Sequence, residues 1–235
     1  MTLKILATAS VAAFTFAIPA FANTDAPESI ASESKNFDVT LGAEMWWTST
    51  KVNEVRRDDS DNPSFYLSVR NDIDYVPNVR VRYSSVDADY MAFDKYDLTL
   101  SYQLMDHELL HFDAGLTFSD LGNTLYRDAN NDTRTDFDSF IWAWYGYGEI
   151  KVPNTELEII GEMNFGDSSG IKSTDLMAGV QYRVPMGKVD VNFRGGYRVI
   201  DLESEDFAIS SAEDGIKGKE FIFADGWFLG ADVTF

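Results

Sequence analysis

Residues 226–235, GWFLGADVTF, decide the fold because their side chains alternate between two kinds. One set of alternate positions is apolar and the other is mostly small or polar: Trp227, Leu229, Ala231, Val233 and Phe235 against Phe228, Gly230, Asp232 and Thr234. Successive side chains of a strand point to opposite faces of a sheet, so this spacing predicts a strand with one apolar face. Such a strand needs a pairing partner and an apolar medium.

The same period of two recurs from Phe37 onward and predicts ten strands. They fall at residues 37–47, 65–70, 79–84, 95–104, 110–119, 141–151, 156–165, 175–184, 189–199 and 226–235. In the sixth segment Trp142 and Trp144 form one face, whereas Ile141, Tyr145 and Tyr147 leave the other face ambiguous. The pattern predicts an all-β fold, a closed antiparallel transmembrane barrel, because only helices and closed barrels satisfy every backbone polar group in lipid.

The connections between these segments alternate between short and long. Short ones lie at residues 76–78, 105–108, 152–154 and 184–187, and long polar ones at residues 51–63, 87–94, 120–136, 166–172 and 201–218. This alternation predicts short periplasmic turns and longer extracellular loops, and an even number of strands places both chain termini on the periplasmic side. Aromatic residues near the strand ends predict two interfacial girdles, with Trp46 and Trp47 outside and Tyr75, Tyr102, Tyr182 and Phe235 inside.

The first residues predict an exported chain. Lys4 precedes an apolar stretch at residues 5–21, and Ala20-Phe21-Ala22 has the small-x-small pattern of a signal-peptidase site. We therefore expect a cleaved signal peptide at residues 1–22, a flexible periplasmic leader at 23–36 and the barrel at 37–235; an uncleaved anchor is the alternative. Downstream of residue 22 no stretch approaches the roughly 20 apolar residues of a membrane-spanning helix.

Composition excludes several classes of function. The chain has no cysteine, so disulfides, thiolate metal sites and cysteine nucleophiles are absent. A formal net charge of -20 argues against nucleic acid as a partner, since phosphate binding requires a basic surface. Aromatic residues make up 14% of the chain, which indicates a folded protein with acidic loops. A soluble exported β-sandwich is the main structural rival.

The Ala20-Phe21-Ala22 signal, the ten amphipathic segments and the closing Phe235 resemble the outer-membrane β-barrels of Gram-negative bacteria. The resemblance implies contact with outer-membrane lipid and lipopolysaccharide, and recognition of the last strand, ending in Phe235, by the barrel-assembly machinery. More narrowly, VPNVRVRYSSVD at residues 76–87, with GDSS at 166–169 and GYR at 196–198, is similar to a family of small outer-membrane proteins of about this length. This narrower resemblance implies a location and an architecture, and it gives no information about activity.

The predicted strands carry many charges on the face opposite the apolar one. These are Glu44, Arg70, Asp72, Arg80, Arg82, Asp97, Asp113, Glu149, Glu158, Glu162, Asp175, Arg183, Arg194, Arg198 and Asp232. A ten-stranded barrel has a narrow lumen, so we expect these groups to pair with one another and fill it. The alternative is a narrow charged conduit for small solutes or ions.

Enzymatic sites have weaker support. Ten-stranded proteases of the omptin type resemble this architecture and use acidic pairs with an Asp-His dyad at the outer rim. The two histidines here, His107 and His111, fall near the predicted turn at residues 105–108, on the periplasmic side. A serine triad of Ser101, His111 and Asp113 would share the lumen, but no oxyanion hole is readable. We therefore predict no catalytic residue, and an outer-membrane hydrolase is the least favoured hypothesis.

The predicted loops give only weak candidates for binding. Asp128, Asn130, Asp132 and Asp136 resemble the start of a calcium loop, but Thr133 stands where glycine is expected and Ser139 where the bidentate glutamate is expected. Arg56 and Arg57 could touch lipid phosphates, although charged loop tips are usually solvated. We predict no cofactor, and expect a monomeric, non-enzymatic barrel that contributes to envelope integrity or surface interaction.

Overall fold

A computed structural model describes residues 37–52, 55–56, 60–73, 75–127, 134–204 and 221–235. The expected signal peptide (1–22) and leader (23–36) lie outside the described residues. Among the described residues, no helix has the length and apolarity needed to cross a membrane.

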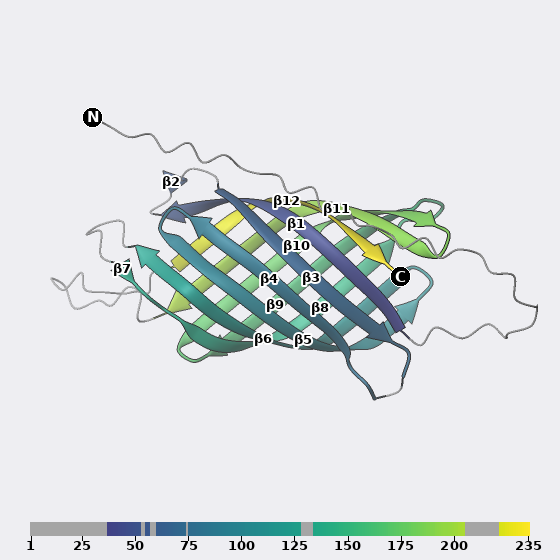
Figure 1. The fold of residues 1–235 in the computed structure, drawn as a ribbon, viewed down its shortest axis with the longest axis horizontal. Helices are drawn as coiled ribbons and strands as arrows, with labels where there is room; N and C mark the ends of the chain where they lie inside the picture. The colour runs from purple at the N-terminus through teal and green to yellow at the C-terminus, as the bar shows by residue number, and fades with distance from the viewer. Residues whose placement is uncertain (1–36, 53–54, 57–59, 74, 128–133, 205–220) are drawn as a thin grey trace, which may run out of the picture. The chain divides into compact units, whose positions relative to one another are not determined.

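Ten long strands and two strands of two residues form one antiparallel sheet. The long strands are β1 (Phe37–Val52), β3 (Ser60–Asn71), β4 (Asn78–Ala88), β5 (Met91–His107), β6 (Leu110–Arg127), β8 (Ser139–Lys151), β9 (Leu157–Ser168), β10 (Ile171–Met186), β11 (Val189–Ser204) and β12 (Phe221–Thr234). The short strands are β2 (Val55–Arg56) and β7 (Arg134–Thr135). Because β12 also pairs with β1, from Thr40 opposite Thr234 to Lys51 opposite Phe223, the sheet closes into a barrel (Figure 1).

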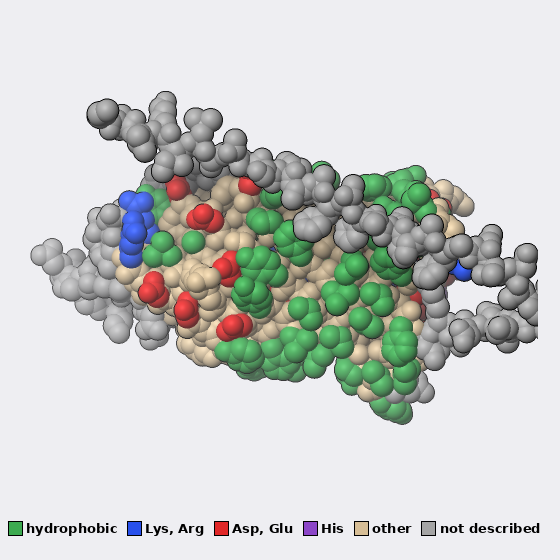
Figure 2. Space-filling view, in the orientation of Figure 1, with side chains coloured by type: hydrophobic (Ala, Val, Ile, Leu, Met, Phe, Trp, Pro, Cys, Tyr) green, Lys and Arg blue, Asp and Glu red, His purple; other side chains and the backbone are tan. Residues whose placement is uncertain are grey.

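The outer surface of the barrel is apolar. Leu98, Trp144 and Leu229 expose 41%, 64% and 59% of their surface, although each lies in the middle of a regular strand. Hydrophobic side chains gather over the middle of the barrel, and acidic ones lie nearer the end that carries β7 (Figure 2). A closed sheet that exposes large apolar side chains and buries charged ones has the arrangement required by a lipid solvent.

The strands extend into the loops expected from the sequence, and at two of the extracellular connections only two residues are left between them. Residues 89–90 alone connect β4 to β5, and residues 169–170 alone connect β9 to β10. Tyr90 and Gly170 adopt positive φ angles of 73° and 77° in these tight turns. The strands continue here because the backbone hydrogen bonds between them do not depend on side-chain polarity. Beyond the bilayer an outward side chain meets water and can be polar, so the apolar alternation ends before the strand does.

The end of β6 is held against the residues that precede β8. The Thr124 hydroxyl and amide donate hydrogen bonds to Asp138 at 2.7 and 3.1 Å, and the hydroxyl accepts one from the Phe137 amide at 2.6 Å. Both donations lower the pKa of the Asp138 carboxyl below its ordinary value, with the hydroxyl the larger cause. The chain from residue 120 to 127, expected as loop, is therefore a strand extension tied to its neighbour.

Trp46 lies inside the barrel and not in the outer girdle. Its side chain is 2% exposed, and its indole Nε1 donates a hydrogen bond of 3.1 Å to the Gly226 carbonyl oxygen on β12. Trp47 is 41% exposed and lies on the lipid side. Only one of two adjacent strand residues can face the bilayer, which is why the prediction of a girdle position fails for Trp46.

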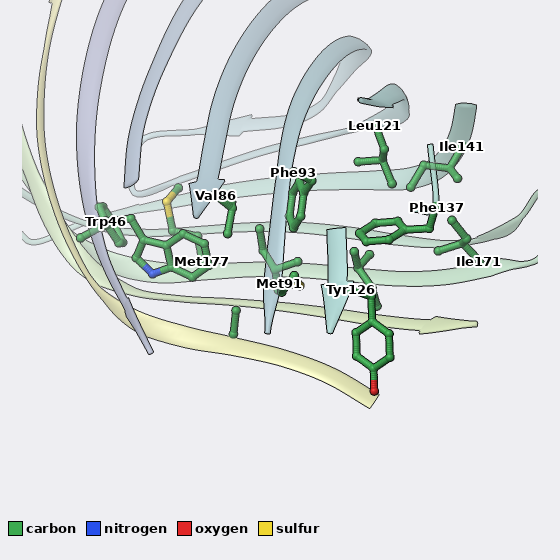
Figure 3. Packing of buried hydrophobic residues seen from close by; sticks show 14 residues of the cluster. Trp46, Val86, Met91, Phe93, Leu121, Tyr126, Phe137, Ile141, Ile171 and Met177 are labelled. Carbon is green, nitrogen blue, oxygen red and sulfur yellow. The ribbon is translucent and has the colours of Figure 1, made fainter. Parts of the chain in front are cut away.

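The extracellular half of the lumen contains an apolar cluster that the sequence-based analysis did not predict (Figure 3). It comprises Trp46, Val86, Met91, Phe93, Leu121, Tyr126, Phe137, Ile141, Ile171, Met177, Ile200, Leu202, Ala224 and Phe228. Met91 and Phe93, which fall in the segment expected as loop, are 1% and 2% exposed. Inward positions near this end are thus filled by hydrocarbon, and the charges lie deeper in the barrel.

Candidate functional site

The structure places most of the charges predicted for the lumen inside the barrel. The buried ones are Glu44, Arg82, Asp97, Asp113, Glu149, Glu158, Glu162, Asp175, Arg194, Arg198 and Asp232. Arg70, Arg80 and Arg183 line a cavity in the same interior and are less buried. Asp72 does not face the lumen: β3 ends at Asn71, and Asp72 is exposed in the connection that follows.

The first group of buried charges joins opposite walls of the barrel. Lys95 on β5 contacts Asp97 at 2.7 Å and Asp175 on β10 at 3.2 Å. The Arg198 guanidinium holds Asp175 in a fork, donating from Nε at 2.9 Å and from Nη2 at 2.8 Å, while the Ser119 hydroxyl donates to Asp97 at 2.6 Å. Because β5 and β10 are separated by β6, β8 and β9, the Lys95–Asp175 contact crosses the lumen.

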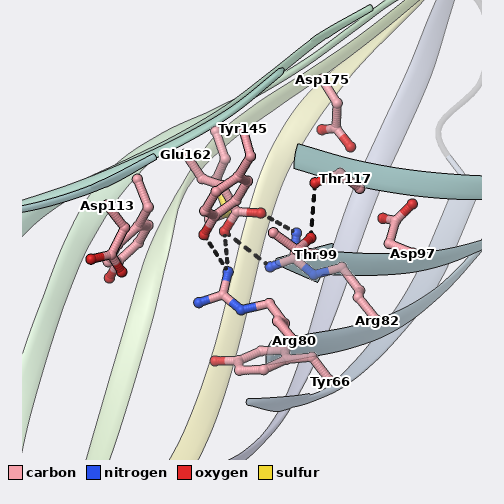
Figure 4. A network of polar contacts seen from close by, with 12 residues as sticks. Tyr66, Arg80, Arg82, Asp97, Thr99, Asp113, Thr117, Tyr145, Glu162 and Asp175 are labelled. Carbon is pink, nitrogen blue, oxygen red and sulfur yellow. Dashed lines mark hydrogen bonds and ion pairs between the residues drawn. The ribbon is translucent and has the colours of Figure 1, made fainter. Parts of the chain in front are cut away.

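A second group is centred on Glu162 of β9 (Figure 4). Its carboxylate accepts hydrogen bonds from Arg80 Nη1 at 2.7 Å, Arg82 Nη1 at 2.8 Å and Arg82 Nη2 at 3.3 Å. Arg80 also donates to the Tyr145 hydroxyl at 3.2 Å. Both arginines belong to β4, across the barrel from β9, so one carboxylate ties two walls together.

A third group surrounds Tyr66 of β3. Its hydroxyl donates to Asp232 at 2.7 Å and accepts from Arg194 at 2.9 Å. Asn192 donates to the other oxygen of Asp232 at 2.6 Å, and Arg194 Nε lies 3.2 Å from Glu44. The tyrosine therefore links β3 to β11 and β12 through buried charged groups.

Several residues of these groups were missed by sequence reasoning. Tyr66, Tyr145, Tyr147 and Lys95 are each between 3% and 6% exposed. Tyrosine reads as an apolar or interfacial residue in an alternation pattern, whereas here each ring supplies both hydrophobic area and a hydroxyl. The alternation of strand positions could have found them. These four residues lie on the same face of the sheet as Arg70, Arg80, Asp97 and Glu149, on the same or neighbouring strands.

At the periplasmic end the lumen opens into a polar cavity of about 340 Å³. Its walls carry Arg70, Arg80, Tyr147, Arg183 and Lys188 among other polar residues. The cavity ends against the second and third charged groups, since Tyr66, Arg80 and Arg194 also line it.

The residues of the hypothetical serine triad are not brought together. His111 Nε2 lies 2.8 Å from Asp113 Oδ1, but Ser101 pairs with Gly115, four residues along β6 from His111. Four residues of a strand span about 13 Å, beyond the reach of a hydrogen bond. His107 is exposed near the periplasmic turn, so the described residues hold no histidine at the outer rim.

The weak metal candidates receive no support. Asp128, Asn130 and Asp132 lie outside the described residues, as does Arg57, and Asp136 is exposed. Within the described residues no group of three or more His, Cys, Asp or Glu side chains has the geometry to hold a metal ion.

The closed sheet, the apolar exterior and the charged interior define an integral outer-membrane β-barrel. No family model matches the chain, and no curated protein matches it.

Solved structures with a similar arrangement include the outer-membrane protease OmpT from Escherichia coli (10% identity, TM-score 0.38, covering 88% of this chain and 99% of that one). Neisserial surface protein A is 14% identical with a TM-score of 0.36, over 85% of this chain and 96% of its own. The β domain of the Bordetella autotransporter BrkA is 11% identical with a TM-score of 0.42, over 84% and 98%.

Proposed function

We propose that the protein is a non-conducting, non-enzymatic barrel of the outer membrane that contributes to envelope integrity or surface interaction. The observation that carries this proposal is the filling of the lumen. A continuous aqueous conduit would expose its wall residues to water, yet Arg82, Glu162 and Arg198 are 4%, 7% and 2% exposed. Each of these side chains is held by charge-assisted hydrogen bonds to another strand, which fixes it in the path.

Two barriers of different chemistry lie in series along the barrel. The charged groups occupy its middle, and the apolar cluster occupies its extracellular half. An ion that passed the charged groups would still lose its hydration shell among the side chains of the cluster, at high free-energy cost. The same cross-lumen contacts join distant strands, so they support a role in which the barrel serves as a rigid membrane element.

The absence of enzymatic activity is part of the proposal. It is supported by the separation of Ser101 from His111 along the β5–β6 ladder, and by the position of both histidines at the periplasmic end. We further propose contact with lipopolysaccharide, assembly through the strand that ends in Phe235, and a monomeric state.

The alternative function, a narrow channel for small solutes or ions, is favoured by the polar cavity at the periplasmic mouth. Planar-bilayer recording separates the two. For the folded protein, with insertion verified by flotation of reconstituted vesicles, we expect no discrete conductance steps. Reproducible steps above leak that scale with the amount of protein would reject the proposal in favour of the channel.

The envelope role has its own measurement. Cells that lack the protein should admit a fluorescent, normally excluded dye faster than the parent, and expression of the wild-type chain should reverse the defect. Equal dye uptake with and without the protein, under detergent stress as well, would reject the role in envelope integrity and leave surface interaction as the proposed role.

A further inference from the structure

Among the four arginines that line the periplasmic cavity, Arg70 has the most distant carboxylate partners. It lies on β3, lines the cavity, and its side chain is 36% exposed. Its nearest carboxylate oxygens are 3.7 Å away on Asp113 and 3.9 Å away on Glu149. Both distances exceed that of a hydrogen bond, so the five N–H groups of this guanidinium have no carboxylate partner at close range in the described part of the chain.

The neighbouring acids are held by closer partners. Glu149 accepts a hydrogen bond of 2.6 Å from the Tyr147 hydroxyl, and Asp113 lies 2.8 Å from His111. Asp38 stands opposite Arg70 in the β1–β3 register, yet no ion pair joins these two side chains within the described residues. Arg70 therefore faces the cavity with unused donors, although three acids lie near it.

Two other cations stand around the same cavity. Arg183, from β10, has one close carboxylate, Glu158 at 2.9 Å, and a distant one, Asp190 at 3.9 Å. Lys188, in the β10–β11 turn, is exposed at the mouth. Because β3 and β10 are separated by β11, β12 and β1, Arg70 and Arg183 approach the cavity from nearly opposite walls.

The two tyrosines that line the cavity, Tyr66 and Tyr147, carry guanidinium groups over their rings. The Tyr147 ring is covered by the guanidiniums of Arg70 and Arg80, whose carbons lie 5.8 and 5.5 Å from its centre. The Tyr66 ring is covered by Arg80 and Arg194 at 5.5 and 5.7 Å, and also by a third arginine. A sugar ring that stacks on an aromatic face finds these two tyrosine rings covered, and the polar walls carry several charged groups, so the cavity is suited to recognition by charge.

We propose that this cavity binds a small oxyanion, a carboxylate or a phosphate, that enters from the periplasm and is held by Arg70 in a bidentate fork. The planar guanidinium matches the spacing of the two oxygens of such a group. Lys188 and Arg183 raise the local concentration of anions at the mouth, and Asp38 opposes binding because it bears the same charge as the ligand. The site is independent of the proposed envelope role, since it requires only the open periplasmic end.

Isothermal titration calorimetry on the folded full chain in detergent tests this proposal, with sodium phosphate, sodium acetate and glucose as probes at constant ionic strength. We expect saturable binding of phosphate or acetate, and the stronger of the two identifies the ligand chemistry. Arg70→Gln should weaken binding about tenfold or more, the loss expected for charge-assisted hydrogen bonds. Asp38→Asn should strengthen it, a change that a merely structural role for Arg70 does not predict.

Arg134→Gln is the matched control, because Arg134 is exposed on β7 at the extracellular end and should leave the affinity unchanged. Arg70→Lys keeps the charge without the fork and should bind with intermediate affinity; it replaces Arg70→Gln as the test if that variant fails to fold. Absence of saturable heat with both anions overturns the proposal. So does equal affinity in the wild type and the Arg70 variant, or binding of glucose alone.

Discussion

Removal of the Glu162 carboxylate should destabilise the barrel strongly. In Glu162→Gln the side chain keeps its size, but it loses its negative charge, and an amide NH2 replaces one of the two oxygens that accept three hydrogen bonds from Arg80 and Arg82, between 2.7 and 3.3 Å. Their side chains are 13% and 4% exposed, so water replaces the lost partner only in part at Arg80 and hardly at all at Arg82. Breaking a buried ion pair from one side costs about 3–5 kcal/mol, because the remaining charge stays buried without compensation.

Urea unfolding of the reconstituted protein, followed by tryptophan fluorescence, measures this change. With a denaturant dependence of about 1–3 kcal/mol per molar urea, the midpoint should fall by roughly 1 M or more. Glu156→Gln is the control, since Glu156 is exposed before β9 and the same chemical change there should leave the midpoint unaltered. Equal midpoints for the two variants would refute the conclusion that this carboxylate ties β4 to β9.

A companion variant separates the effect of lost charge balance from that of lost packing. Combining Glu162→Met with Arg80→Leu and Arg82→Leu replaces the whole ionic group by apolar side chains. Such replacements are often close to neutral, so this variant should be more stable than Glu162→Gln. If the triple variant is less stable than Glu162→Gln, the ionic group stabilises the barrel mainly through its hydrogen bonds, and the unpaired charge in Glu162→Gln is the smaller effect.

The remaining predictions concern the seam and the lipid face. In Gly226→Ala the new Cβ would lie 1.7 Å from the Trp47 carbonyl oxygen, so β1 and β12 cannot pair in register and close the barrel. The heat-modifiable folded band should therefore be lost on gels. Gly122→Ala, with open space around the new Cβ, should retain the band. Leu98→Arg places a charge in the outward centre of β5 and should lower the free energy of unfolding by about 2–4 kcal/mol, measured against Leu98→Met. A loss below 1 kcal/mol would place Leu98 in a polar environment, contrary to the lipid-facing assignment.

The alternation of side chains was sufficient to predict the strands and their lipid-facing sides. Leu98, Ile159 and Val180 were assigned to apolar faces, and all three are exposed on the barrel exterior. This information is local, because the period of a strand is fixed by its own backbone. The local signal was insufficient where both faces are apolar, as at Ile141 and Tyr145, which turn inward while Trp142 and Trp144 turn outward.

The ends of the strands were harder to predict. Residues 87–94 read as loop because their polarity breaks the apolar stripe, yet all but two of them belong to β4 and β5. Water outside the bilayer accepts polar outward side chains without interrupting the ladder. Side-chain pattern therefore marks the limits of the apolar layer, and backbone pairing determines the limits of the strand.

The sequence by itself determined the closed barrel, its ten long strands, and a lumen rich in charge, because each of these depends on the side-chain order within single segments. Only the tertiary structure decided which charges meet. Glu162 meets Arg80 and Arg82, and Arg70 is left without a close carboxylate, because closure and strand stagger set the height of each side chain across the lumen. That stagger arises from all strands together, so no single segment encodes it.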